Sequence, residues 1–399
     1  MQSKKIVFLI RCMTGGGAER VVSLLSREFA DCGYNLTLIL THQSKEEALL
    51  HTVDDRVKVI SLPDEVKCDS TAKKKHLMKK ELLQKKFRQI IGRYDDNEFV
   101  VRKYEIRNFD EVEYLKGYFK SHPKSTAIAF LYDSIFLSLL SVQNTNKLII
   151  SERGDPREAL GSKTDVAFFK SMFNKADAMV FQSPDAKAWY VENASIKNGK
   201  VIFNPIKSDL PERFTGERRK TVVDFCRISS QKNLHLLVKA FAKFNEDFPE
   251  YELCIYGDAV GNGVDGYVES VQALVDTLEC KDKIRILPAQ KDIHNIIKDC
   301  AMFVSSSDFE GMSNSMLEAM GMGLPTICTD CPAGGARAII KDHENGILVP
   351  IKDDESMYKA MKEVAENKEL AEKLSMNATK LREQLALDKI IDQWMEIIE

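Results

Sequence analysis

Glu310 and Glu318 flank a run of small and polar residues, G-M-S-N-S-M-L, within the segment 301–323. The segment starts as a short apolar strand, passes through a Ser/Asp/Gly turn and enters a Met/Leu/Ala-rich helix that stops at Gly321 or Gly323. A helix N-terminus offers unpaired backbone N–H groups to an anion. The pattern therefore predicts a phosphate site between two carboxylates. Because Glu is also common as a helix cap, this spacing alone does not decide between a site and ordinary capping.

A glycine-rich loop follows the apolar run 5–10 and precedes apolar residues at helical spacing, which predicts a strand, a turn and a helix. Its glycines do not fit G-x-G-x-x-G, because Arg20 takes the last position, and no Gly-Lys-Ser/Thr is present for an ATP-binding loop. Gly16 and Gly17 would let the backbone approach a ligand at the carboxyl edge of a parallel sheet. The alternative is a turn that serves only tight packing of the strand and the helix.

Length and composition indicate a two-domain globular protein, with 399 residues of which 44% are hydrophobic. Residues 1–200 carry 33 Lys/Arg against 26 Asp/Glu (+7), and residues 201–399 carry 24 against 34 (−10). The basic half is a candidate for contact with an anionic partner such as a membrane surface, whereas we expect no nucleic-acid partner. The nine cysteines have neither a disulfide framework nor a zinc pattern, which suggests a reducing compartment.

No signal peptide or membrane-spanning stretch is visible, and the longest apolar region, 126–142, is interrupted by Asp133. We therefore expect a cytoplasmic protein, soluble or located at the cytoplasmic face of the membrane. No Asp-x-Asp pair occurs in the chain, so a metal clamp for a diphosphate is not expected.

Strand and helix patterns alternate in both halves of the chain, and the polar stretch 207–220 between them is the best linker. Two such series predict a ligand at strand carboxyl ends, between domains. Residues 73–93 are different, because they hold nine Lys/Arg and one Glu with apolar residues recurring every three to five positions. This basic amphipathic helix either packs its apolar stripe on the domain or contacts an anionic membrane. Residues 94–125 are charged and weakly patterned.

The sequence E-G-M-S-N-S-M-L-E-A-M-G-M-G-L-P-T-I, followed by P-A-G-G-A-R-A-I-I and H-E-N-G-I-L-V-P, closely resembles the donor-binding signature of the family 4 retaining glycosyltransferases, the glycosyl transferases group 1. The resemblance implies that Glu310 lies beside the donor sugar and that Glu318 binds the ribose hydroxyls. F-C-R-I-S-S-Q-K-N is similar to the family's G-R-x4-K-N segment, which implies that Arg227 and Lys232 hold the donor diphosphate. The backbone expected to face the diphosphate belongs to Gly311, Met312, Ser313, Asn314 and Ser315, with Gly16 and Gly17 across the cleft.

The resemblance also implies a GT-B architecture, in which two doubly wound Rossmann-like α/β domains face a cleft. Its expected parts are an acceptor-binding domain (1–206), a nucleotide-sugar-binding domain (207–385) and a C-terminal helix (386–399) that crosses back to the first domain. Arg153 stands where the family often has a His. Glu152, Arg153 and Asp133 are the weak candidates for acceptor contact, while Cys226 and Pro288 replace glycines that are common in the family.

The expected reaction is transfer of a sugar from a nucleotide diphosphate donor, a UDP-sugar, to a hydroxyl of a glycan or lipid-linked glycan acceptor, with retention and without a metal or cofactor. This activity belongs to cell-surface polysaccharide or glycoconjugate synthesis. Two alternatives stay open. A GT-B sugar-nucleotide epimerase would share the cleft, and a non-catalytic partner subunit of another transferase would share the fold.

Overall fold

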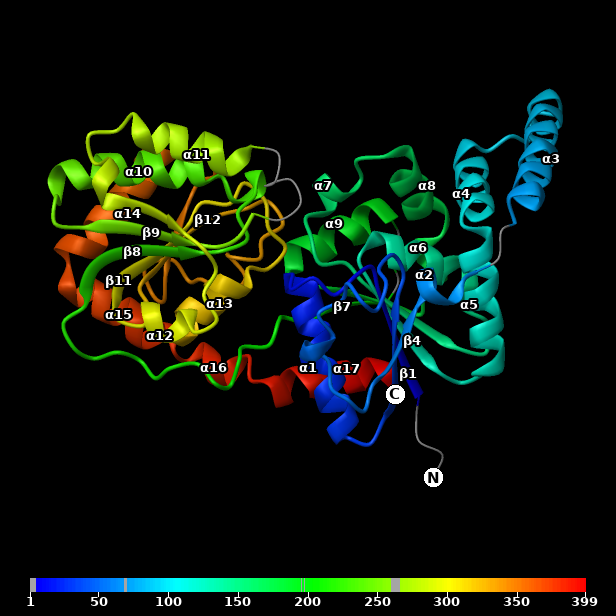
Figure 1. The fold of residues 1–399 in the computed structure, drawn as a ribbon, viewed down its shortest axis with the longest axis horizontal. Helices are drawn as coiled ribbons and strands as arrows, with labels where there is room; N and C mark the ends of the chain where they lie inside the picture. Colours follow the sequence, from blue (N-terminus) through cyan, green and yellow to red (C-terminus); the bar gives the residue numbers. More distant parts are fainter. Residues whose placement is uncertain (1–4, 68–69, 195, 197, 260–265) are drawn as a thin grey trace. The chain divides into compact units, whose positions relative to one another are not determined.

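The computed structural model describes residues 5–67, 70–194, 196, 198–259 and 266–399, which form two compact units (Figure 1). Unit 1 comprises Met1–Gln182, Ala186–Ile202 and Ile391–Glu399, and unit 2 comprises Ser183–Asp185 and Phe203–Ile390. Each unit is an α/β layer structure built on one parallel sheet.

The unit 1 sheet has the order β3-β2-β1-β4-β5-β6-β7, with all neighbouring strands parallel. Its central strands are runs of apolar residues buried on both faces, as expected for a parallel sheet covered by helices. The order reverses between β1 and β4, so polar residues that follow these two strands lie at a topological switch point. The strands are β1 (Lys5–Ile10), β2 (Asn35–Leu40), β3 (Lys58–Ser61), β4 (Thr126–Phe130), β5 (Lys147–Ser151), β6 (Ala178–Phe181) and β7 (Gly199–Val201).

The helices of unit 1 include two that the sequence pattern did not reveal, α4 and α5, in the weakly patterned region 94–125. Asp95 caps α4 by accepting hydrogen bonds from the N–H groups of Asn97 and Glu98, a signal that the sequence contains. Tyr104 of α4 packs edge-on against Phe136 and Phe168, which stack on each other with ring centroids 4.2 Å apart. The helices are α1 (Gly17–Asp31), α2 (Leu62–Glu65), α3 (Thr71–Ile90), α4 (Asp96–Arg107), α5 (Phe109–Ser121), α6 (Tyr132–Ser141), α7 (Pro156–Ala159), α8 (Lys163–Ser171) and α9 (Pro184–Ala194), with 3-10 turns η1 (Leu50–Thr52) and η2 (Phe173–Lys175).

Helix α3 departs from the expectation that its apolar stripe packs on the domain. Leu83, Phe87 and Ile90 are 68%, 62% and 83% exposed, while Glu81 is buried on the opposite side of the helix. The helix lies beside α4 at the margin of unit 1 (Figure 1). Of the two alternatives for this helix, a stripe packed on the domain does not hold for Leu83, Phe87 and Ile90, although Leu77 and Met78 are half-buried.

The unit 2 sheet has the order β10-β9-β8-β11-β12-β13, again with all neighbours parallel. Its core combines the central strands with the apolar faces of α10 and α14. Its strands are β8 (Arg219–Phe225), β9 (Glu252–Tyr256), β10 (Ile284–Leu287), β11 (Cys300–Ser305), β12 (Thr326–Thr329) and β13 (Ile347–Val349). Its helices are α10 (Leu234–Asp247), α11 (Tyr267–Asp276), α12 (Ile293–Ile297), α13 (Asn314–Gly321), α14 (Asp354–Glu366), α15 (Lys368–Ala378) and α16 (Leu381–Gln384), with 3-10 turns η3 (Ser230–Lys232) and η5 (Lys281–Lys283).

The last helix, α17 (Leu387–Ile398), returns to unit 1 from Ile391 onward. Trp394 is 1% exposed, and its ring centroid lies 6.0 Å from that of Phe130 on β4. Lys147 donates from Nζ to the carbonyl of Ile398 at 3.4 Å. The predicted return of the C-terminal helix to the first sheet is confirmed, and burial of its apolar face is the physical reason.

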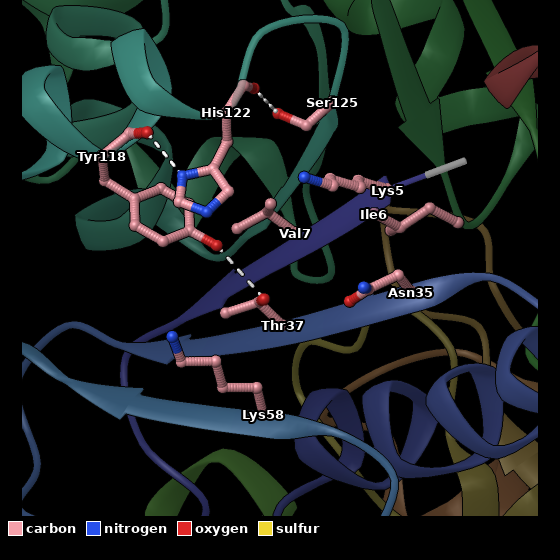
Figure 2. A pocket seen from close by; sticks show the side chains of 9 residues that line it. All are labelled: Lys5, Ile6, Val7, Asn35, Thr37, Lys58, Tyr118, His122 and Ser125. Atoms are coloured by element: carbon pink, nitrogen blue, oxygen red, sulfur yellow. Dashed lines mark hydrogen bonds between the residues drawn. The ribbon is translucent and has the colours of Figure 1, made fainter. Parts of the chain in front are cut away.

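A pocket of about 210 Å³ opens at the amino-terminal ends of β1, β2 and β3 (Figure 2). Lys5, Asn35 and Lys58 line it, and the Tyr118 hydroxyl at its wall donates to Thr37 Oγ1 at 3.1 Å. The pocket lies at the opposite edge of the sheet from the residues that follow the strand carboxyl ends, so it is separate from the predicted site.

Candidate active site

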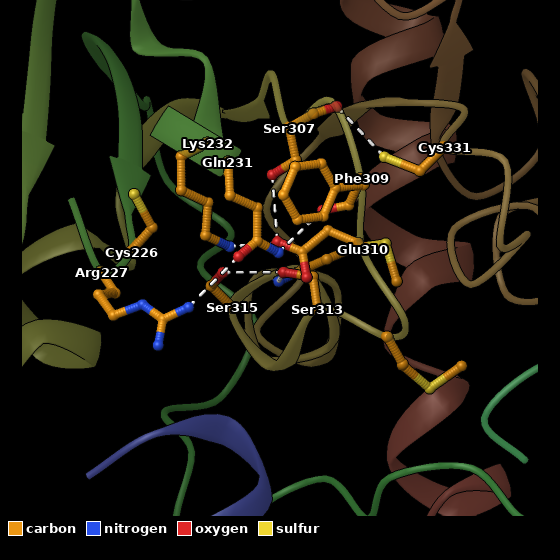
Figure 3. A network of polar contacts seen from close by, with 12 residues as sticks. Cys226, Arg227, Gln231, Lys232, Ser307, Phe309, Glu310, Ser313, Ser315 and Cys331 are labelled. Carbon is orange, nitrogen blue, oxygen red and sulfur yellow. Dashed lines mark hydrogen bonds and ion pairs between the residues drawn. The ribbon is translucent and has the colours of Figure 1, made fainter. Parts of the chain in front are cut away.

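The candidate site of unit 2 is built on the connection between β11 and α13 (Figure 3). Helix α13 begins at Asn314, and the Ser313 hydroxyl caps it by accepting from the N–H of Met316 at 3.3 Å. The Ser313 and Ser315 hydroxyls lie 3.0 Å apart. Because the cap uses the third helical N–H, the turn presents hydroxyls and the first backbone N–H groups at the positive end of the helix dipole.

Hydrogen bonds connect a second segment, between β8 and α10, to this turn. Ser306 donates from Oγ to the carbonyls of Lys232 and Asn233 at 2.8 and 3.0 Å. Gln231 donates from Nε2 to the carbonyl of Phe309 at 2.8 Å. These bonds fix the two strand carboxyl ends in register, as neighbouring positions of β8 and β11 in one sheet require.

Lys232 and Glu310 form an ion pair at the junction of these two segments (Figure 3). Their side chains are only 11% and 17% exposed, and the Ser307 hydroxyl also donates to Glu310 Oε1 at 3.1 Å. An ammonium group has three N–H donors, so the pair leaves Lys232 able to bond further acceptors. The structure thus brings together two of the three residues predicted to be catalytic.

Burial and neighbouring charges together set the electrostatics around the ion pair. Burial, the largest single effect, would lower the pKa of Lys232, but the charge and hydrogen bond of Glu310, with the nearby Cys226 and Asp224, together outweigh burial and raise that pKa above its ordinary value. Asp224, at 1% exposure on β8, has its pKa raised to about 6 by burial, against the opposing charge of Lys232. Lys232 therefore carries a fixed positive charge at neutral pH within a largely buried carboxylate environment.

Arg227, the third residue predicted to be catalytic, lies on the same β8–α10 connection with an exposed side chain. Its guanidinium donates from Nη2 to Gln231 Oε1 at 3.3 Å. The two cations therefore differ, since Lys232 is fixed by its partner and Arg227 can follow a ligand. A diphosphate has enough oxygen acceptors to engage both.

Glu318 is buried on α13 at 4% exposure and bonds His294 of α12, with 2.8 Å between Oε2 and Nε2. The ring of His294 meets the ring of Phe225 edge-on at 6.0 Å. His294 is not predicted by the sequence, because α12 is short and carries no motif. A ribose bound at Glu318 would share this carboxylate with His294.

The turn after β12 packs against the turn that carries Glu310 and stabilises its position. Cys331 donates from Sγ to the carbonyl of Ser307 at 3.2 Å, which gives the C-x-x-C sequence a structural role. A Cβ built on Gly335 would lie 1.7 Å from the carbonyl oxygen of Gly311. Only glycine permits this approach, so the P-A-G-G sequence serves the position of the loop that follows Glu310.

The glycine loop of unit 1 stands at the carboxyl end of β1, as predicted. Gly15 has a φ of +91°, Gly16 occupies the cap position and Gly17 is the first residue of α1. A Cβ on Gly16 would lie 2.3 Å from Oε2 of Glu19, which is 7% exposed. The positive φ of Gly15 suits the turn, and the prediction that Gly16 and Gly17 contact a ligand stays a prediction.

Asp133 and Glu152 lie just after β4 and β5, which are adjacent strands in the unit 1 sheet. Asp133 pairs with Arg11, which follows β1, at 2.9 Å between Oδ2 and Nη1. The Glu152 carboxylate accepts from the backbone N–H groups of Arg153 and Gly154, both at 2.9 Å. Parallel strands thus bring the three acceptor candidates to one edge of unit 1.

Burial shifts the pKa values of Glu152, Arg153 and two tyrosines near them. It raises the pKa of Glu152 to about 7, against the opposing effect of the two backbone hydrogen bonds and Arg153. It lowers the pKa of Arg153 to about 10. Tyr132 and Tyr190, whose hydroxyl oxygens lie 2.5 Å apart, have their pKa values raised by burial and next by the Glu152 charge. The sequence does not predict a role for these two tyrosines, because nothing in their pattern distinguishes them from ordinary aromatic residues of the core.

Residues 207–381 match the family model described as Glycosyl transferases group 1. The chain carries a glycosyl transferases group 1 domain. A glycosyltransferase of Methanocaldococcus jannaschii without a characterised activity is 23% identical over 325 residues, which cover 70% of this chain and 78% of that protein. An N-acetylgalactosamine-N,N'-diacetylbacillosaminyl-diphospho-undecaprenol 4-alpha-N-acetylgalactosaminyltransferase of Campylobacter jejuni is 26% identical over 278 residues, which cover 66% and 73%.

Solved structures of glycosyltransferases confirm the GT-B fold of this chain. Staphylococcus aureus TarM, solved with UDP among its ligands, superposes with a TM-score of 0.76 at 14% identity, covering 99% of this chain and 100% of that one. Anabaena HepE, solved in complex with UDP, gives a TM-score of 0.74 at 18% identity and covers 98% of both chains. At these identities the likeness concerns the fold alone.

Within this glycosyltransferase, the predicted residues fall into a group in each unit. Unit 2 collects Glu310 on the β11–α13 loop, Glu318 on α13, Arg227 and Lys232, while unit 1 collects the glycine loop and the acceptor candidates at its own sheet edge. Their roles toward a ligand remain predictions.

The change Glu152→Gln is expected to stabilise the glycosyltransferase more at high than at low pH. With a folded pKa of about 7, above the ordinary 4.5, Glu152 binds its proton more tightly in the folded state, so stability falls as pH rises between these values. Glutamine keeps an acceptor for the two N–H groups but carries no charge. Urea unfolding should show a gain larger by ~3 kcal/mol at about pH 8 than at about pH 5. An equal gain at both pH values would contradict a raised pKa.

Proposed function

We propose that this protein is a retaining glycosyltransferase that moves a sugar from a UDP-sugar to a hydroxyl of a glycan or lipid-linked glycan acceptor. Cell-surface polysaccharide or glycoconjugate synthesis is the corresponding process. The observation that carries the proposal is the Lys232–Glu310 pair beside Arg227 at the N-terminus of α13. This arrangement combines fixed positive charge with a carboxylate, as a diphosphate attached to a sugar requires.

The names of related proteins support the donor and the acceptor class. TarM and HepE were both solved with UDP, and the Campylobacter relative is named as acting on a diphospho-undecaprenol glycan. A relative of Bacillus subtilis, 26% identical over 234 residues, is a poly(glycerol-phosphate) alpha-glucosyltransferase. The first two proteins thus support a UDP donor, and the names of the other two support a lipid-linked or polymeric acceptor.

In the proposed reaction the bond between the anomeric carbon and the diphosphate oxygen breaks. The acceptor oxygen forms the new bond on the same face of the sugar, and its proton passes to the departing diphosphate. Lys232 and Arg227 stabilise the charge that develops on the diphosphate, with the α13 N–H groups as further donors. Glu310 orients Lys232 and lies beside the sugar, so most of the rate enhancement comes from positioning and electrostatics.

Stabilisation of the folded protein by nucleotide-sugars tests the proposal. Because a ligand that binds only the folded state stabilises it more the tighter it binds at a given concentration, UDP and one UDP-sugar should raise Tm, whereas ADP- and GDP-sugars should raise it less. Addition of EDTA should leave both the shift and the transfer unchanged, since two cations take the place of a metal. Loss of the shift in EDTA with recovery on adding magnesium or manganese would contradict metal-free binding, and no shift with any nucleotide-sugar would contradict the function.

The variant Glu318→Gln provides a residue-level test of donor binding. If Glu318 holds the ribose hydroxyls, loss of its charge should weaken UDP binding by about 1.5–3 kcal/mol. Glutamine retains an oxygen for His294, so folding should change little. Glu310→Gln is the matched variant. Its UDP affinity should stay nearly constant, because UDP contains the ribose but lacks the donor sugar beside which Glu310 is proposed to lie. Equal losses in the two variants, measured by titration calorimetry, would contradict the separate roles.

A further inference from the structure

The outer face of α3 is a surface of unit 1 on which apolar and cationic side chains alternate. Of the nine large apolar side chains that are exposed among the described residues, five lie between positions 82 and 91. Isolated exposed apolar residues need no explanation, but a contiguous group marks a contact surface. The outer face consists of Lys75, Lys79, Lys80, Leu82, Leu83, Lys86, Phe87 and Ile90, with Ile91 and Arg93 directly after the helix, all of them exposed.

The opposite face of α3 holds the helix on unit 1, and it does so through charged groups. Lys74 pairs with Asp110 at the start of α5 at 2.8 Å. The Lys85 ammonium lies 4.3 Å from the ring centroid of Phe99 on α4. Glu81 is buried on this face at 5% exposure. Cations and an acid thus provide the attachment, which leaves the larger apolar side chains of the same helix in solvent.

The charge of the outer face is of one sign. The segment 73–93 contains nine Lys/Arg and a single acid, Glu81, which points to the attached side. Exposed cations therefore lie among the exposed apolar residues with no acid between them. A lysine can place its aliphatic stem along apolar groups and its ammonium in water, so the face is suited to a boundary between an apolar and an anionic layer.

We propose that the outer face of α3 docks this protein on an anionic membrane surface. Helix α3 lies in the plane of the interface, with Leu83, Phe87 and Ile90 at the acyl boundary and the lysines among the phosphates. No helix in the described part of the chain is long and apolar enough to cross a membrane. The contact is therefore peripheral, and it does not depend on the reaction proposed above.

Charge favours a lipid surface over a second copy of the chain as the occupant. Two copies that met through this face would bring Lys79, Lys80 and Lys86 of one helix close to the same cations of the other. Like charges placed together oppose association, whereas phosphates attract the same residues. Anionic lipid is the partner that satisfies both the apolar and the cationic side chains.

Co-sedimentation of the full chain with vesicles tests the proposal. The protein should bind phosphatidylcholine vesicles that contain phosphatidylglycerol, bind pure phosphatidylcholine weakly, and lose affinity as sodium chloride rises. A variant with four changes, Lys79→Glu, Lys80→Glu, Lys86→Glu and Arg93→Glu, should bind anionic vesicles at least about a hundredfold more weakly. Each cation near such a surface contributes about fivefold to the affinity.

The matched control changes four exposed lysines of unit 2, Lys239, Lys341, Lys373 and Lys380, to Glu. The net charge changes equally in both variants, so a specific surface predicts a large loss only in the α3 variant. Circular dichroism and Tm confirm folding. Equal losses in the two variants would mean that overall charge, and not α3, governs the attraction.

The apolar residues are tested with Leu83→Gln/Ile90→Gln against Val191→Gln/Met376→Gln, whose original side chains are 46% and 51% exposed. Glutamine is a good helix former, and all four sites are in solvent, so stability should hold. Only the α3 pair should lose vesicle binding at high salt by tenfold or more. Absence of binding by the parent protein would overturn the proposal. So would a parent dimer, seen by analytical ultracentrifugation, that the α3 pair converts to monomer.

Discussion

Lys232→Met should lower the free energy of unfolding by about 3 kcal/mol and weaken UDP binding by at least about tenfold, because it leaves Glu310 largely buried without its cation. Among the residues that the structure describes, the partner left to Glu310 would be the Ser307 hydroxyl at 3.1 Å. The loss of the cation also removes a donor for the diphosphate, so turnover should fall on the order of a hundredfold or more. Urea unfolding, UDP titration and the transfer rate measure the three effects.

A double-mutant cycle separates the ion pair from the ligand contacts. Glu310→Gln alone should also destabilise the fold and lower turnover, yet it should leave UDP affinity nearly constant. The variant Lys232→Met/Glu310→Gln should be more stable than the sum of the single changes predicts, by about 1–3 kcal/mol, because neither charge is then unpaired. Additive losses would show that the pair makes no joint contribution.

The exposed pair Lys220–Glu250 is the control for this cycle. Its Nζ and Oε1 atoms lie 2.7 Å apart, but the side chains are 54% and 44% exposed, so water can replace the interaction. Lys220→Met should change neither stability nor UDP binding measurably. A large effect at this surface pair would mean that loss of any lysine, and not the buried location of Lys232, explains the result.

Gly335→Ala should destabilise the protein by about 1–3 kcal/mol and reduce donor binding, although residue 335 itself touches no ligand in the proposal. The new Cβ would meet the Gly311 carbonyl oxygen at 1.7 Å and the Met312 Cα at 3.2 Å. Both contacts are with backbone, so no side chain can rotate away and the loop after Glu310 must shift. Thermal unfolding and UDP titration of the variant measure the two consequences.

Gly117→Ala is the matched control, since Gly117 lies inside α5 with nothing within 4 Å of a built Cβ. Alanine is preferred over glycine in a helix interior, so this change should stabilise unit 1 by about 0.5–1 kcal/mol and leave UDP affinity unchanged. If Gly335→Ala behaves like Gly117→Ala, the close approach to Gly311 does not position the loop.

The amino-acid sequence by itself determined the alternation of strands and helices outside residues 94–125 and the residues that follow each buried strand. Continuous apolar runs such as 5–10 have one favourable location, inside a parallel sheet covered by helices. Residues directly after such strands then lie at the carboxyl edge whatever the rest of the fold does. This is why the sequence alone predicts Glu152 and the loop after β11 at sheet edges, where the structure has them.

Only the tertiary structure decided which side chains meet. Lys232 and Glu310 are 78 positions apart in the chain, and Glu318 finds His294 24 positions away, so no local period encodes either contact. The close approach of Gly335 to Gly311 likewise depends on how the turns after β11 and β12 stack. Such contacts depend on side-chain geometry across neighbouring strands, which residue types do not specify.

Helix α3 is a further example in which the sequence does not specify the tertiary contacts. The spacing of its apolar residues predicts which of them share a face, but it does not say which face is attached to the protein. Asp110 on α5 and the Phe99 ring on α4 offer favourable partners to Lys74 and Lys85, and these partners lie in a region whose helices were not recognised. The attachment of α3 was therefore fixed by its neighbours, which hold Lys74 and Lys85 on the attached face and leave Leu83 and Ile90 in solvent.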